Sequence, residues 1–302
     1  MTAGLLIDPP GRQGHGRVPD SAVAALDLAL ARRAAGRLPG DHIGAGVGLG
    51  TELAQLRPYV EGDDVRQIDA AASARTNEPH VRLHVPERAL TTWLLLDVSP
   101  SMAFGSEVRL KSDVAAGAAT VLSRIGVRRG GRVGVLRWGA HEEALLPPKG
   151  GRHALGGIDR LIEAGVASDG TTPACDFDHA IRRLGLLARQ PGLVIVISDF
   201  RDPSPWDRAF AALGRRHRLI GVEISDPRES ELPDAGHVVV RDPETGQDVE
   251  VNTGSAQLRA AYAQAAAEHA GHLASAFRQA RARHVPLSTS RDWLRDLGVG
   301  LR

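Results

Sequence analysis

From about residue 90 onward, the chain alternates between short apolar runs and longer segments with helical spacing. The apolar runs have the length of buried strands, and they predict strands at 91–97, 132–137, 193–199 and 218–223. The segments between them predict helices near 107–128, 152–163, 174–189 and 205–215. Strands that alternate with helices in this way are typical of an α/β fold with a mainly parallel sheet, which helices cover on both faces.

The end of the chain predicts three further elements. Residues 237–251 contain two short strand-like segments around the polar turn 244–247, which predicts a small β-hairpin inserted in the α/β domain. An Ala-rich segment predicts a long helix over about 255–283, and a short helix is expected at 290–297.

The first ninety residues follow a different pattern. Residues 1–19 carry Gly or Pro at 7 positions, so we expect a loose amino-terminal arm. A helix is predicted to start at Asp20 or Ser21 and to stop at 39–40, where Pro and Gly follow each other. The expected regions are therefore an arm at 1–19, a helix and an extended segment at 20–89, and an α/β domain at 90–302.

The overall composition narrows the classes of function. Lys and Arg number 37 and Asp and Glu 36, so the formal net charge is +1. This balance argues against a dedicated nucleic-acid binder, because that class needs a surplus of positive charge. Cys175 is the only cysteine, which excludes an intramolecular disulfide and a cysteine-based metal cluster. Since the sequence shows neither an apolar run of membrane-spanning length nor a secretory signal, we expect a cytoplasmic protein without a membrane span.

The first candidate for chemistry follows the predicted strand 91–97. Asp97, Ser99 and Ser101 form an Asp-x-Ser-x-Ser pattern at the carboxyl end of this strand, which is the edge at which open α/β sheets bind ligands. One carboxylate and two hydroxyls offer only oxygen ligands, and these suit a hard cation such as Mg²⁺. The alternative interpretation is structural, an Asp that ends a strand and two serines that cap the next turn.

Two later segments strengthen the interpretation as a metal site. The predicted strand 193–199 ends in Ser198 and Asp199, and the Asp199 carboxylate emerges at the same sheet edge if the two strands are neighbours. Between the strands, Thr171 and Thr172 precede a predicted helix, and either hydroxyl is a candidate third oxygen ligand. The alternative role for these threonines is to cap that helix.

In this order and context, the three segments resemble the metal-ion-dependent adhesion site of von Willebrand factor A domains. The resemblance implies a site for Mg²⁺ or Mn²⁺ that is formed by Asp97, Ser99, Ser101, Thr172 and Asp199. Register with the Gly-x-Thr pattern of these domains favours Thr172 over Thr171. In such domains the hydroxyls bind the metal directly, the acids act partly through water, and one position stays open for a carboxylate of a partner protein.

A second resemblance covers the flanking segments. The sequence RPYVEGDDVRQIDAAASAR at 57–75 resembles the signature of the bacterial domain of unknown function 58 family. Shorter matches follow at 226–236, 242–246 and 287–301. Ala70 and Leu53 stand where the family usually has Trp and Phe, so a hydrophobic anchor of the amino-terminal segment is smaller here.

Acids and arginines are concentrated within 57–75. The candidate residues of this network are Arg57, Tyr59, Asp63, Asp64, Arg66, Asp69 and Arg75. Pairs of Arg and carboxylate groups give geometric specificity as well as energy. We expect the network to pin this segment onto the α/β domain, and the alternative is a surface for a partner protein.

The resemblances imply a function in protein binding. Proteins of this type are similar to those encoded beside MoxR-type AAA+ ATPases, and the pair is thought to act as a chaperone or maturation system. We therefore expect a non-catalytic adaptor whose cation binds a carboxylate of the ATPase or of a client protein. The alternative is a Mg²⁺-dependent phosphoester hydrolase that uses Asp97 and Asp199. Such enzymes typically carry a second acid where this chain has Ser99, whose hydroxyl is a poor general acid or base at neutral pH.

Overall fold

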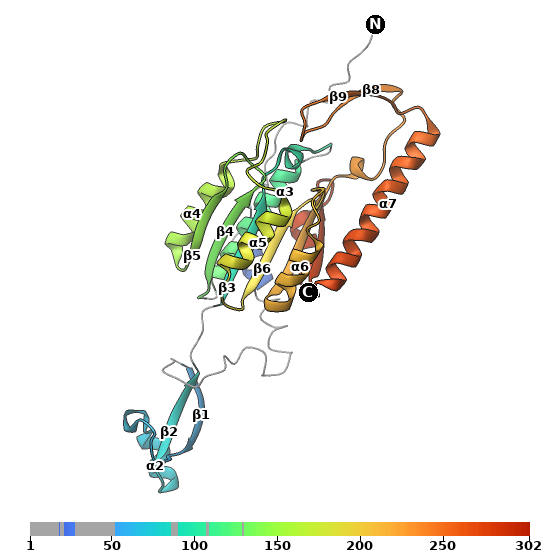
Figure 1. Cartoon of the computed structure of the whole chain (residues 1–302). Helices are drawn as coiled ribbons and strands as arrows, with labels where there is room; N and C mark the ends of the chain where they lie inside the picture. The colour runs from blue at the N-terminus through green and yellow to red at the C-terminus, as the bar shows by residue number, and fades with distance from the viewer. Residues whose placement is uncertain (1–17, 19–20, 28–51, 86–89, 107–108, 129) are drawn as a thin grey trace. The chain divides into compact units, whose positions relative to one another are not determined.

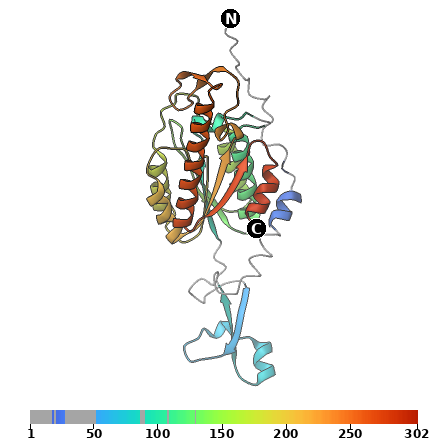
Figure 2. The same ribbon diagram turned by 90° about the vertical axis from the view of Figure 1, so that its right-hand side faces the viewer.

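The structure is a computed structural model that describes residue 18 and residues 21–27, 52–85, 90–106, 109–128 and 130–302. The described residues form two compact units, one within residues 1–30 and 90–302 and the other within 31–89. Figures 1 and 2 show the elements of each unit from two directions. No helix in the described part of the chain is both long and apolar enough to cross a membrane.

The larger unit is built around a six-stranded sheet, in which the strands follow the order β10, β7, β6, β3, β4 and β5. Their bounds are Thr91–Asp97 for β3, Arg132–Trp138 for β4, Ala144–Lys149 for β5, Leu193–Ser198 for β6, Arg218–Ser225 for β7 and Arg283–Ser288 for β10. β5 is antiparallel to β4, and the other neighbours in this sheet are parallel. The chain therefore starts in the middle of the sheet and winds outward on both sides, which confirms the predicted α/β fold with a mainly parallel sheet.

Helices cover both faces of this sheet, as Figure 1 shows. One face packs against the helical residues 21–27, α3 (Lys111–Arg128), α4 (Arg152–Glu163) and α8 (Trp293–Gly300). The other face packs against α5 (Phe177–Leu187), α6 (Asp207–Arg216) and α7 (Ala256–Gln279). β3 serves both cores because its side chains alternate between the faces, with Leu94 and Leu96 in the first core and Trp93 and Leu95 in the second.

The two edge strands, β5 and β10, were not predicted by the apolar runs. Their sequences are ALLPPK and RHVPLS, so each contains proline. Proline is tolerated at a sheet edge because one side of the strand has no neighbour to bond. Both strands also alternate between exposed and less exposed positions, in contrast to the continuously buried central strands. Continuous apolar runs therefore identify the centre of the sheet and leave out its edges.

The predicted helix over 255–283 is wrong at its carboxyl end. α7 ends at Gln279, Arg281 adopts a left-handed backbone with a φ of 51°, and β10 begins at Arg283. A left-handed residue just after the last turn is a common way for a helix to end. Pro286 also prevents the following segment from continuing the helix.

The predicted hairpin forms a small sheet of its own. β8 (His237–Arg241) and β9 (Asp248–Asn252) are antiparallel partners, and neither belongs to the six-stranded sheet. In the chain, the hairpin lies between β7 and α7. Figures 1 and 2 both show it beyond one end of the large sheet, on the side of the segment that leads into α3.

The start of the predicted amino-terminal helix is present and belongs to the larger unit. Residues 21–27 are helical, and Val23 is buried within the core that contains α3. The predicted continuation of this helix to residue 40 and nearly all of the predicted arm lie outside the described residues.

The smaller unit is an antiparallel strand pair with two short helices in its connection. β1 (Glu52–Pro58) pairs with β2 (His80–Val85). The connection contains a 3-10 helix at Val65–Gln67 and α2 (Ala70–Thr76). Ala72 and Val81 are buried in this unit.

Candidate metal and partner-binding site

The carboxyl ends of β3 and β6 bring two of the predicted metal-binding segments together. The two strands are parallel neighbours, and Leu96 of β3 pairs with Ile197 of β6. Asp97 therefore comes beside Ser198, and Asp199 follows directly. β3 and β6 also mark the point where the strand order reverses direction, which is where open α/β sheets usually bind ligands.

Asp97 is buried, with 2% of its surface exposed, and both of its carboxylate oxygens are held. The backbone N–H of Ser99 donates to Oδ1 at 2.9 Å, and the Ser198 hydroxyl donates to Oδ2 at 2.6 Å. The hydroxyl oxygens of Ser99 and Ser101 lie 3.0 Å apart. Residues 97–101, named the first loop below, thus gather one carboxylate and two hydroxyls in a small volume.

Asp199 is paired with a buried lysine. Lys111 Nζ lies 2.6 Å from Asp199 Oδ2 and 2.6 Å from Glu229 Oε1, and the lysine side chain is only 1% exposed. Asp199 Oδ1 accepts a hydrogen bond from the backbone N–H of Arg201, whose Nε lies 3.2 Å from Glu229 Oε1. The buried ammonium of Lys111 therefore forms ion pairs with two carboxylates. The Arg201 side chain adds a second positive charge beside Glu229.

Burial and charge shift the pKa values of the two aspartates in opposite directions. Burial, followed by the nearby charge of Asp199, raises the pKa of Asp97 to about 7. Burial would also raise the pKa of Asp199, but the ammonium of Lys111 together with the hydrogen bond from the Arg201 N–H outweighs it, so that pKa lies below its usual value. A cation beside Asp97 would remove the cost of ionising this buried carboxylate. The oxygen donors of the first loop are of the type that a hard divalent cation such as Mg²⁺ or Mn²⁺ prefers, while the charge of Asp199 is already balanced by Lys111.

The predicted threonine ligand lies in a loop that reaches the first loop. Ala167 N donates to Val98 O at 2.8 Å, which joins the segment after α4 to residues 97–101. Thr171 is half-buried and Thr172 is exposed. Among the described residues, neither hydroxyl is hydrogen-bonded to the two aspartates. The choice of Thr172 over Thr171 thus stays a prediction.

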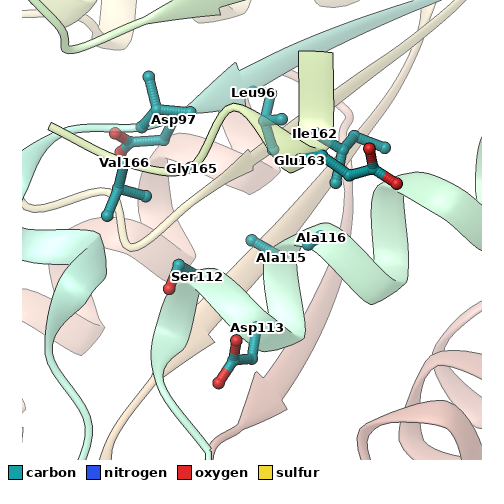
Figure 3. Close-up of a pocket in the computed structure, with 11 residues that line it drawn as sticks. Leu96, Asp97, Ser112, Asp113, Ala115, Ala116, Ile162, Glu163, Gly165 and Val166 are labelled. Atoms are coloured by element: carbon teal, nitrogen blue, oxygen red, sulfur yellow. The ribbon is translucent and has the colours of Figure 1, made fainter. Parts of the chain in front are cut away.

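A cavity of about 210 Å³ lies beside the first loop, between β3, α3 and α4. Figure 3 shows Asp97 and Val166 at one end of this cavity and the α3 residues Ser112 and Asp113 on another side. Within the described part of the chain, the Ser112 hydroxyl has no hydrogen-bond partner. The size and the polar groups of the cavity suit ordered water molecules.

Three residues at this site were missed in the sequence, namely Lys111, Glu229 and Glu244. The sequence gives one indication that Lys111 is unusual, which is that only two of the 37 basic residues are lysines. Glu229 belongs to a capping box that begins at Asp226, a pattern that local spacing identifies. Glu244 accepts a hydrogen bond from the backbone N–H of Ser101 at 3.1 Å, and no local pattern indicates a contact across 143 residues.

In the smaller unit, the acids of 57–75 mainly bind backbone groups. Asp63 forms an ion pair of 2.6 Å with Arg57 and accepts a hydrogen bond from Val60 N. Asp64 caps the 3-10 helix, and Asp69 caps α2 by accepting a hydrogen bond from Ala72 N at 2.9 Å. These contacts stabilise the conformation of the segment that connects β1 and β2.

The remaining members of the predicted network are more exposed. The side chains of Arg66 and Arg75 lie on the surface, and Arg75 Nε donates to the carbonyl of Ala71 in its own helix. Tyr59 is half-buried, and its backbone N–H donates to Pro79 O at 2.7 Å. These contacts lie inside the smaller unit, and a role of this surface in partner binding stays a prediction.

Replacement of Asp69 by alanine should destabilise the smaller unit by about 1 kcal/mol, because α2 loses its cap. Hydrogen exchange of residues 70–76 measures the effect locally. Arg66→Ala is the control, since its exposed side chain predicts a change within about 0.5 kcal/mol. If Arg66→Ala loosened α2 as much as Asp69→Ala, side-chain charge pairing would matter more than the cap.

Comparisons with known proteins found a matching family and several similar sequences. Residues 55–272 match the family described as "Protein of unknown function DUF58". An uncharacterized protein of Mycobacterium tuberculosis is 36% identical over 98% of this chain and 93% of its own length. A shorter uncharacterized protein of Mycobacterium avium is 38% identical over 50% of this chain and 89% of its own length.

The solved structures that the comparison matched include BatB from Bacteroides thetaiotaomicron and the SpRpn10 VWA domain. BatB is 15% identical with a TM-score of 0.44, and the comparison covers 70% of this chain and 97% of BatB. The SpRpn10 VWA domain is 12% identical with a TM-score of 0.40, and the comparison covers 69% of this chain and 93% of that domain.

Proposed function

Because the chain belongs to the DUF58 family and its larger unit is an α/β fold whose loop motifs resemble those of von Willebrand factor A domains, we propose that it binds a partner protein through a divalent cation. Asp97, Ser99 and Ser101 would hold the cation, with Asp199 and a threonine of the 171–172 segment beside them. The cation would supply a positive charge that accepts a carboxylate of the partner.

The convergence of oxygen atoms at the ends of β3 and β6 is the observation that carries this proposal. The Asp97 carboxylate and the hydroxyls of Ser99 and Ser101 lie within five residues of chain, and their contacts fix the loop. Preorganised oxygen donors of this kind suit Mg²⁺, which usually keeps some of its water. A metal site with few charged ligands leaves the cation attractive to an incoming carboxylate.

The same geometry favours binding over phosphoester hydrolysis. A nucleophilic aspartate needs a carboxylate oxygen that faces the substrate. Both Asp97 oxygens accept hydrogen bonds inside the protein, and the residue is almost fully buried. The hydroxyl of Ser99, which stands where a second acid would act, lies against the Ser101 hydroxyl. A carboxylate held in this way can still act on a cation through bound water, whereas a nucleophile needs direct contact with its substrate, so a binding role fits the observed contacts better than a catalytic role does.

For the partner, we propose a MoxR-type AAA+ ATPase, with this protein acting as an adaptor in the maturation of client proteins. The partner or its client would present an acidic side chain to the cation. This part of the proposal follows from the family resemblance of the signature segment and the α/β domain.

Affinity capture from the lysate of the native host tests the proposal. Wild type in Mg²⁺ should retain an AAA+ ATPase, identified by mass spectrometry, and both EDTA and Asp97→Ala should abolish its retention. Asp159→Ala, an acid of α4 that is far from the first loop in sequence, is the matched control. Equal retention of the ATPase by Asp97→Ala or in EDTA would contradict a metal-dependent contact. Mg²⁺-dependent turnover of a generic phosphoester that Asp97→Ala abolishes would instead support the hydrolase.

A further inference from the structure

The tip of the β8–β9 hairpin touches the first loop. The backbone N–H of Ser101 donates to Glu244 Oε1 at 3.1 Å. Glu244 is exposed as a residue, but the loop partly desolvates its carboxylate, and this desolvation raises the pKa of Glu244. The charge of Asp199 is also close enough to act on Glu244. A carboxylate of the chain itself therefore lies beside the oxygen atoms of the candidate metal site.

The hairpin tip also rests on the segment that contains the candidate threonines. Gly170 N donates to Pro243 O at 2.8 Å. A Cβ atom built on Gly246 would lie 3.5 Å from the Cα atom of Gly170, so the two glycines form a close backbone contact. The tip thus touches two of the three segments that form the candidate site.

The turn that carries Glu244 is internally braced. Asp242 accepts hydrogen bonds from the backbone N–H of Glu244 at 3.0 Å and from the Thr245 hydroxyl at 2.7 Å. These bonds fix the backbone from which the Glu244 side chain projects toward the first loop. The position of Glu244 is therefore a property of the hairpin, and Glu244 moves with it.

The body of the hairpin is held much less firmly than its tip. Most residues of β8 and β9 are exposed, including Val239, Val240 and Val249. At its base, Thr253 N donates to Gly236 O at 2.7 Å, and Gly236 has a left-handed φ of 71°. An element with few buried apolar contacts separates from the fold at low cost. The contacts at the tip thus decide whether the hairpin stays over the site.

We propose that Glu244 is an internal competitor for the partner's carboxylate, so that the hairpin covers the metal site until an acidic partner displaces it. This inference rests on the proposed function, because it assigns Glu244 to the side of the site that the partner would use. The Ser101 N–H is a single donor, and a partner carboxylate that approached the first loop would meet Glu244 at that group. Glu244 and the partner's carboxylate would also repel each other beside the negatively charged Asp199. Only one of the two carboxylates would therefore occupy this position.

The partner that fits this mechanism presents Asp or Glu on an extended segment. Such a segment could reach the first loop and take over the contact of Glu244 with the Ser101 N–H. Displacement would release a hairpin whose three exposed valines, Val239, Val240 and Val249, are accessible whether or not Glu244 contacts the first loop. The hairpin would in this way link occupation of the metal site to the position of the β8–β9 pair.

Mn²⁺ binding to the full chain tests the inference, with free Mn²⁺ measured by electron paramagnetic resonance. Glu244→Ala should weaken Mn²⁺ binding about tenfold, because a carboxylate next to the cation is lost. Millimolar acetate should restore much of the affinity of Glu244→Ala and leave that of the wild type unchanged. Glu250→Gln is the control, because Glu250 lies on β9 and is exposed. Hydrogen exchange at 237–252 should become faster in Glu244→Ala and slower in the wild type when Mn²⁺ is added.

The outcomes separate this inference from the proposed function. If the wild type binds Mn²⁺ and Asp97→Ala does not, the metal site stands. Unchanged Mn²⁺ affinity and hairpin exchange in Glu244→Ala would then overturn the internal competitor alone. If the wild type binds Mn²⁺ no better than Asp97→Ala does, both the metal-dependent function and the competitor are overturned.

Discussion

Replacement of Lys111 by methionine is expected to destabilise the protein by about 3–5 kcal/mol, the usual cost of removing one partner from a buried ion pair. Lys111 Nζ lies 2.6 Å from both Asp199 and Glu229, and the lysine side chain is almost completely buried. Burial alone would lower the pKa of Lys111, but the two carboxylates outweigh it and raise that pKa above its usual value. Methionine keeps most of the volume and leaves both carboxylates without their ammonium.

Urea unfolding of Lys111→Met and of Lys149→Met measures this effect. Lys149 is the other lysine of the chain, and it is exposed at the end of β5, so its substitution should change the free energy of unfolding by less than about 0.5 kcal/mol. Similar stability of the two variants would mean that the buried ammonium is not needed. Partial recovery of the stability of Lys111→Met by Mg²⁺ would show that a divalent cation replaces the lost charge.

Without added metal, the contribution of Asp97 to the free energy of unfolding should fall as the pH rises from about 4 to about 7, whereas the lowered pKa values of His217 and His269 act in the opposite direction. The pKa of Asp97 is about 7 in the folded protein and 3.8 is the ordinary value, so the folded protein binds the extra proton between these pH values. The stability that the protonated Asp97 carboxyl provides is fully present below pH 3.8 and is lost as the pH rises through about 7.

Asp97→Asn removes this titration and keeps an oxygen that can accept the hydrogen bond from Ser99 N. At pH 8 without metal, we expect the variant to be more stable than the wild type by about 1–2 kcal/mol, or an increase in Tm of a few degrees. Mg²⁺ should raise the Tm of the wild type more at pH 8 than at pH 5.5, and it should leave the variant unchanged.

Comparison of the two pH profiles isolates Asp97 from the other charged groups at the site, which are Asp199, Lys111, Glu229 and Glu244. Asp159→Asn is the control for a loss of negative charge outside the first loop. Parallel profiles for the wild type and Asp97→Asn would contradict the raised pKa of Asp97.

The sequence predicts the centre of the sheet and the meeting of Asp97 with Asp199 for a simple physical reason. Central parallel strands are covered on both sides, so they are read as continuous apolar runs. Their carboxyl ends lie at one edge, so polar residues that follow such runs come together there. β3 and β6 are neighbours, and this brings Asp97 beside Ser198.

The parts that sequence analysis missed depend on contacts between distant segments. Lys111 begins a helix, and its partners Asp199 and Glu229 follow 88 and 118 residues later. The match to the family at 242–246 marks the hairpin turn but does not indicate that Glu244 contacts the first loop, because the turn folds back onto it across 143 residues. Single-residue patterns and local spacing do not contain this information. The edge strands were missed for another reason, because their proline-containing sequences lack the continuous apolar runs of the centre.

The position of the first loop at the end of β3 has a mechanical consequence. β3 lies in the middle of the sheet and pairs in parallel with β4 on one side and β6 on the other. A partner that pulls on the loop along the strand direction would load both rows of hydrogen bonds in shear, so that many bonds must break together. A force on an edge strand could instead peel its bonds one at a time. The first loop is therefore attached to the part of the larger unit that should resist extension most strongly.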